Sequence, residues 1–162
     1  MVVALIVMGQ PLWCECGAWA PWSDDIHSVH NSQHLVDPYF FTHILHGVLF
    51  YALLKLLWPR LALVRRFWLA LSLEAVWELV ENSDIVVERF RQTTVSLHYH
   101  GDSIANSVGD LLACAAGFGA AASLPVWGSL ALVLGTELML YLWIKDSLFL
   151  VIWALIFPEK PQ

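Results

Sequence analysis

Ionisable side chains recur at helical spacing within stretches of the sequence that are otherwise apolar. His43 and His46 are three residues apart, and Glu74 and Glu78 are four residues apart, so each pair shares one face of a helix. A histidine or glutamate whose pKa is tuned by its neighbours is a common general acid or base. The candidate catalytic residues are therefore His43, His46, Glu74, Glu78 and Asp110.

A second set of polar residues could bind a polar substrate beside this group. Amide, hydroxyl and carboxyl side chains hydrogen-bond polar groups, and arginine pairs with an anionic headgroup. The candidate substrate-binding residues are Asn82, Arg89, Arg91, Tyr99, Asp102, Ser103 and Asn106. No nucleophile is evident, because Ser103 and Ser107 qualify by proximity alone and helical serines more often serve hydrogen bonding or packing.

The same ionisable residues leave two other interpretations open. Imidazole and carboxylate are ligand types for Zn, Fe or Mn, but no complete signature such as His-Glu-x-x-His is present, so the metal content stays unknown. Polar side chains also hold membrane helices together, at about 0.6 kcal/mol for each hydrogen bond. We favour a functional site, because several ionisable groups at matched depth exceed what packing requires.

A separate cluster of possible metal ligands lies before the first strong apolar stretch. It contains Cys14, Cys16, His27, His30 and His34. Thiolates and imidazoles could bind a soft or borderline metal. The alternative is a loop at the membrane interface, anchored by Trp13, Trp19 and Trp22. We favour the interfacial loop, since the spacing of the cysteines and histidines matches no known zinc pattern.

The composition decides which class of protein must position these groups. Of 162 residues, 59% are hydrophobic and 14% are charged, more apolar than a soluble domain of this size could bury. Disorder requires low hydrophobicity, and nucleic-acid binding requires a basic surface, whereas this chain has 8 Lys+Arg against 14 Asp+Glu. We predict one all-α domain over residues 1–162, an integral membrane bundle of about four to six segments.

Four apolar stretches are long enough to cross a membrane, which takes about 20 residues. They are predicted at 39–58, 67–87, 103–124 and 126–144, with weaker apolar segments at 1–9 and 147–157. The first weak segment has no basic start or clear cleavage site, so we expect the end of a longer helix rather than a signal peptide. Antiparallel packing of the first three spans would bring their polar stripes together.

Two further features of the spans predict orientation and packing. The loop at 59–66 carries Arg60, Arg65 and Arg66, so the positive-inside rule places it in the cytoplasm and the polar stripes in the outer half of the membrane. The third span has small residues at every fourth position, which allows close helix contact and predicts that it is the centre of the bundle. These residues are Gly109, Ala113, Gly117 and Ala121.

Several motifs together resemble a known family over about Trp13 to Pro158. They are Cys14-Glu-Cys-Gly17, Asn31-Ser-Gln-His-Leu35, Thr42-His-Ile-Leu-His-Gly47, Glu74-Ala-Val-Trp-Glu78, Glu88-Arg-Phe-Arg91 and Tyr99-His-Gly-Asp-Ser-Ile-Ala-Asn-Ser107. The combination resembles the bacterial multi-pass membrane family known as uncharacterised protein family 0314. The resemblance implies a bacterial inner-membrane location and a longer first helix, and brings no established activity. A weaker similarity is to VanZ-like membrane proteins.

Three functions remain open at this level. The favoured one is a membrane enzyme acting on a lipid or lipid-linked headgroup, because the polar stripes meet near the headgroup level. A small proton-coupled transporter would also use intramembrane carboxylates and histidines, but the chain lacks the inverted repeats common in carriers, a symmetry that a homo-oligomer could supply. The third is a non-catalytic assembly partner for another membrane protein. The expected partners are membrane lipids, and no nucleic acid.

Overall fold

The computed structural model describes residues 1–157, which form seven helices and no strand. The four long helices are α2 (Phe40–Leu57), α3 (Leu63–Glu81), α5 (Ile104–Ser123) and α6 (Val126–Ile144). The three short ones are α1 (Val2–Val7), α4 (Asp84–Thr93) and α7 (Leu148–Ile156). The prediction of an all-α fold is thus confirmed. The last five residues of the predicted domain, 158–162, lie outside the described part.

Three of these helices, α2, α5 and α6, have the length and apolar composition needed to cross a membrane. Helix α3 is similarly long, but it carries two arginines and three glutamates. The predicted segment 67–87 is divided in the structure, because α3 ends at Glu81 and α4 begins at Asp84. At the break, Ser83 has an extended backbone and Asn82 turns its side chain toward the loop after α4.

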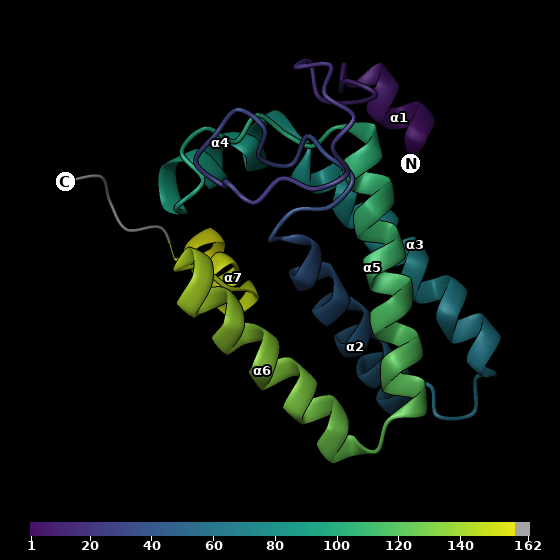
Figure 1. Cartoon of the computed structure of the whole chain (residues 1–162). Coiled ribbons are helices and arrows are strands. Elements are labelled where there is room, and N and C mark those ends of the chain that lie inside the picture. The colour runs from purple at the N-terminus through teal and green to yellow at the C-terminus, as the bar shows by residue number, and fades with distance from the viewer. Residues whose placement is uncertain (158–162) are drawn as a thin grey trace.

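Helices α2 and α5 form the central pair of the bundle and lie side by side in Figure 1. Their backbones touch, because a Cβ atom at Gly47 would collide with the carbonyl oxygen of Cys114. A Cβ at Gly117 would likewise collide with the carbonyl of Ile44. The predicted row of small residues on α5 is buried, with Gly117 at this contact and Gly109 against the Leu35 carbonyl of the long loop. Glycines on both helices are therefore what allows the close approach.

The polar halves of three helices meet at one end of the bundle. In Figure 1 the long loop of residues 8–39 and α4 lie at the end where α2 and α5 begin and α3 ends. We call this the loop end. Three backbone hydrogen bonds attach the loop to the start of α5, from Ser103 N to Ser32 O at 2.9 Å, from Ile104 N to Pro11 O at 2.8 Å and from Ala105 N to Leu12 O at 3.2 Å. The loop thus covers the polar ends of the helices.

Helix α7 returns to the loop end and packs against α4. Val151 of α7 shares a buried apolar cluster with Val87 and Phe90 of α4 and with Tyr99. The helix begins after a turn in which Lys145 adopts a left-handed conformation, with φ of 59°. The weak apolar segment 147–157 of the sequence is therefore a short helix that forms one wall of the polar region.

Candidate functional site

A buried carboxyl group joins the two histidines of α2. Oε1 of Glu74, which is fully buried, lies 2.5 Å from Nδ1 of His43. Nδ1 of His46 lies 3.1 Å from Oε2 of the same carboxyl. The two imidazole rings stand edge to face with centroids 5.0 Å apart. One glutamate of α3 thus orients both histidines of α2.

Two more acidic side chains surround His43. Its Nδ1 lies 3.5 Å from Oε1 of Glu78, and its Nε2 lies 4.0 Å from Oδ2 of Asp110 on α5. The structure therefore brings together all five candidate catalytic residues, from three different helices. When Nδ1 donates its proton to Glu74, Nε2 is left as an acceptor on the side of Asp110. This is the ring geometry that a histidine base requires.

Several polar atoms at the centre of this cluster lack a hydrogen-bond partner among residues 1–157. They are both carboxyl oxygens of Glu78, Oδ1 of Asp110 and Oγ of Ser107. Buried polar atoms without partners are rare in native proteins. The cluster thus has hydrogen-bonding capacity that the described residues do not use.

The same cluster has donor atoms close enough to share a cation. Donor atoms of His43, His46 and Glu74 lie within 4.8 Å of one another, and so do those of His43, Glu78 and Glu81. These nitrogen and oxygen donors are of the kind that binds Zn, Fe or Mn. Glu81 extends the acidic row of α3, but it is not among the candidates from the sequence.

A second network holds the end of α3 to the loop before α5. The Asn82 side chain donates to Oδ2 of Asp102 at 2.8 Å and accepts from the Asp102 backbone N–H at 2.6 Å. The Tyr99 hydroxyl donates to Oδ1 of Asp102 at 3.0 Å. Burial raises the pKa of the Asp102 carboxyl to about 7. These three candidate binding residues are therefore engaged with one another.

Two further candidates, Ser103 and Asn106, fix the long loop. The Ser103 hydroxyl accepts from the Asn106 backbone N–H at 3.1 Å and caps α5. The Asn106 side chain donates to the carbonyl of His34 at 2.9 Å and lies 3.4 Å from Oδ2 of Asp37. Burial also raises the pKa of the Asp37 carboxyl. Asn106 thus couples the loop to the site.

The two candidate arginines lie elsewhere. Arg89 donates to the carbonyl of Leu155 at 3.1 Å, and Arg91 pairs with Glu88 at 2.9 Å on the same helix. Neither side chain lines the cavity described next. Their amphipathic helix, α4, places them toward α7 and the surface, because the break at Asn82 turns the chain away from the α3 axis.

A cavity of about 290 Å³ opens from the polar cluster toward α7. Its polar end includes His43, His46, Glu81, Asp102, Asn106 and Asp110. Its apolar wall includes Leu49, Phe50, Trp77, Phe90, Leu148, Val151, Ile152 and Leu155. The volume is close to the lower limit of ligand pockets, roughly 300 Å³. The sequence does not predict the apolar wall, because nothing in the residues of α4 and α7 indicates that these helices face α2.

Comparisons with known proteins place the chain in a family. The family model described as a protein of unknown function (DUF2585) matches residues 5–160. The UPF0314 protein of Paracoccus denitrificans (strain Pd 1222) is 44% identical over 154 residues, 95% of this chain and 80% of that protein. The UPF0314 protein of Sphingopyxis alaskensis is 39% identical over 160 residues, 99% of this chain and 85% of that protein.

A third relative, the UPF0314 protein of Brucella anthropi, is 43% identical over 150 residues, 93% of this chain and 76% of that protein. No solved structure matches the chain. The resemblance to family 0314 is confirmed, whereas the weaker similarity to VanZ-like membrane proteins is not shown by these matches. Because one family model covers nearly the whole chain, the protein belongs to the DUF2585 family, and its relatives are UPF0314 proteins.

Proposed function

We propose that the cavity binds the headgroup of a membrane lipid or lipid-linked molecule, with His43 as the general acid or base. The observation that carries this proposal is the shape and polarity of the cavity. Its lining combines the polar side chains of His43 and Asp110 with the apolar side chains of α7. A molecule that fills it contacts both kinds of side chain, which suits a membrane lipid with a polar headgroup and apolar chains.

The charge of the polar end favours a headgroup with hydroxyl or amine groups. Acidic side chains outnumber the two histidines there, and both candidate arginines are engaged outside the cavity. None of the described residues that line the cavity is an arginine or a lysine, so an anionic phosphate would lack a cation to pair with. Hydroxyl and ammonium groups instead donate hydrogen bonds to carboxyl oxygens. The free Oδ1 of Asp110, which lines the cavity, is available for this role.

The arrangement around His43 supports one chemical step. A proton moves from a headgroup hydroxyl or ammonium to Nε2 of His43, so an O–H or N–H bond breaks and a new N–H bond forms. The Glu74 side chain, held at Nδ1, stabilises the resulting imidazolium. His46 shares this carboxyl and keeps it in place.

The proposed location is the bacterial inner membrane. Helices α2, α5 and α6 are candidate membrane spans, whereas proteins of the bacterial outer membrane are typically β-barrels. The positive-inside rule favours a cytoplasmic loop between α2 and α3, where Arg60 lies and is followed by Arg65 in the first turn of α3. With that orientation, the loop end and the cavity lie on the periplasmic side.

The proposal can be tested by lipid analysis of a bacterium that lacks the chromosomal gene. The strain is complemented with the wild-type protein, with His43→Ala or with His27→Ala. His27 is an exposed histidine of the long loop and serves as a matched control. We expect a lipid to accumulate with His43→Ala and not with His27→Ala. Identical lipid profiles for all three proteins would contradict the proposal. Proton flux in proteoliposomes that requires Glu78 would support a transporter instead.

A further inference from the structure

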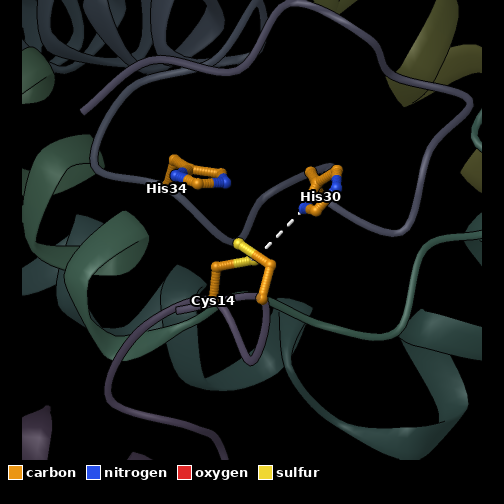
Figure 2. A group of neighbouring side chains, drawn as sticks. Cys14, His30 and His34 are labelled. Atoms are coloured by element: carbon orange, nitrogen blue, oxygen red, sulfur yellow. Dashed lines mark hydrogen bonds between the residues drawn. The ribbon is translucent and has the colours of Figure 1, made fainter. Parts of the chain in front are cut away.

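The long loop of residues 8–39 brings four metal-ligand side chains together, outside the cavity described above. Cys14, Cys16, His30 and His34 each offer a donor atom, and these atoms lie within 4.8 Å of one another. Figure 2 shows Cys14 facing His30, with His34 on the same stretch of loop. His27 is outside the group and exposed to solvent. Four of the five possible metal ligands named from the sequence therefore lie together in the fold.

A tetrahedral ion would require the two cysteine sulfurs to move apart by about 1 Å. Zn–S bonds of about 2.3 Å and Zn–N bonds of about 2.0–2.1 Å place tetrahedral donors roughly 3.3–3.8 Å apart. Sγ of Cys14 lies 3.2 Å from Nδ1 of His30 and 2.8 Å from Sγ of Cys16. Both cysteines are free thiols, and Cys16 is exposed, so rotation of its side chain can open the shorter distance.

The surroundings of the ligands favour metal binding. Nδ1 of His34 lies 2.6 Å from the carbonyl oxygen of Ala20, so it is the protonated nitrogen and Nε2 is free to bind a metal. Metal-binding histidines commonly donate their second ring N–H to such a carbonyl. The backbone N–H of Ala18 donates to Sγ of Cys16 at 3.4 Å, a bond that stabilises a thiolate.

We propose that Cys14, Cys16, His30 and His34 bind one Zn²⁺ ion in a closed tetrahedral site. Two thiolates and two imidazoles form the ligand set of structural zinc sites. The spacing also comes close to a zinc pattern, since 13 residues (17–29) separate the cysteines from a His-x₃-His pair. It departs from that pattern only in having one residue between the cysteines instead of two.

A bound ion would cross-link the long loop, which has no helix or strand to hold it in place. Loops longer than about 12–15 residues without helices or strands are uncommon in compact domains. The ion would join residue 14, next to the contact with α5, to residues 30 and 34, which flank Ser32 in the lining of the cavity. A hollow of about 540 Å³ beside Cys14, Cys16 and His30, lined also by His98 and His100, gives an ion a path inward.

The test uses the full chain in detergent micelles, stripped with a chelator and reloaded with Zn²⁺ or Co²⁺. We expect about one Zn²⁺ per chain by elemental analysis, falling below about one tenth in Cys16→Ser and His34→Ala. With Co²⁺ we expect a thiolate-to-cobalt charge-transfer absorption that Cys16→Ser loses. His27→Ala is the matched control and should retain both the zinc and the absorption.

Several results would overturn the proposal. Equal zinc content in the wild type and in Cys16→Ser is one of them, and a cobalt spectrum without thiolate character is another. A Cys14–Cys16 disulfide that resists mild reduction, found by thiol labelling and mass spectrometry, would also contradict it. Because His43→Ala leaves all four ligands in place, it should retain the zinc, so this test is independent of the proposed lipid site.

Discussion

Nδ1 of His43 and Oε1 of Glu74 are 2.5 Å apart in space and 31 positions apart in the sequence. This contact joins the start of α2 to the second half of α3, and both side chains are almost completely buried. It holds the His43 ring so that Nε2 faces Asp110 and the cavity. The geometry of the proposed base therefore depends on one carboxyl group from a neighbouring helix.

Replacing the Glu74 carboxyl group should reduce the rate of lipid conversion more than it reduces lipid binding. In Glu74→Gln the amide can still contact His43, but it cannot stabilise the imidazolium by charge, so conversion of the lipid should fall about 100-fold or more. The measurement is the rate of lipid conversion in membranes that carry equal amounts of protein. Glu88→Gln, on the exposed face of α4, is the control and should behave as the wild type. Equal rates for Glu74→Gln and the control would exclude this role.

Two glycines of α5 should respond in opposite ways to the same substitution. Gly117→Ala places a methyl group against the Ile44 carbonyl of α2 and should lower the free energy of unfolding by about 1–3 kcal/mol. Gly119→Ala meets open space and should raise it by up to about 1 kcal/mol, because alanine favours the helix. Denaturant titration in micelles measures both. A stable Gly117→Ala protein would show that α2 and α5 are not in backbone contact.

The Asp102 carboxyl should make stability depend on pH. Burial raises its pKa from 3.8 to about 7. Between these values the folded chain keeps the proton that the unfolded chain has lost, so the free energy of unfolding falls as pH rises from about 4 to 7. Above pH 7 this contribution is constant. Asp102→Asn should flatten this part of the profile, measured as thermal midpoint against pH.

A control for the pH profile is Asp24→Asn, in the exposed part of the long loop. It should leave the slope between pH 4 and 7 as in the wild type. A wild-type stability that rises with pH over this interval, together with an unchanged profile for Asp102→Asn, would contradict the assignment to Asp102.

The Tyr39 hydroxyl should stabilise the junction between α6 and α7. It lies 2.8 Å from the Ser96 hydroxyl and donates to Oδ2 of Asp146 at 3.0 Å. Tyr39→Phe leaves the buried Asp146 carboxyl without this partner and should cost about 1–3 kcal/mol of unfolding free energy. Amide hydrogen exchange should then increase in α7. Tyr141→Phe, on the exposed face of α6, should change neither quantity, and equal exchange in both variants would exclude the role of Tyr39.

The convergence of the polar stripes follows from the sequence alone. His43 and Glu74 lie in long apolar stretches that predict helices, and helical spacing with antiparallel packing is enough to bring them together. The break at Asn82 does not follow, because Asn82 leaves the helix to bond with Asp102, which lies 20 residues further along the chain. No local pattern in the sequence reports such a contact.

Other features depend on partners that a sequence does not reveal. Gly47 is required because the Cys114 carbonyl approaches it, and this contact exists only after α2 and α5 pack. Arg89 is predicted from its residue type to bind an anion, but its guanidinium group donates to the carbonyl of Leu155. The cysteine and histidine residues of the long loop have a spacing close to that of zinc sites. Their proximity in space depends on the path of the loop, which this spacing does not predict.

Native mass spectrometry of the purified chain shows whether the cavity holds a lipid headgroup. We expect one retained lipid with a hydroxyl or amine headgroup, and a retention at least about tenfold lower in Ile152→Trp, which fills the cavity from its apolar wall. Leu130→Trp, on the exposed face of α6, should retain the lipid. Equal retention in the two variants, or a wild-type chain that never carries a lipid, would show that the cavity does not hold a lipid headgroup.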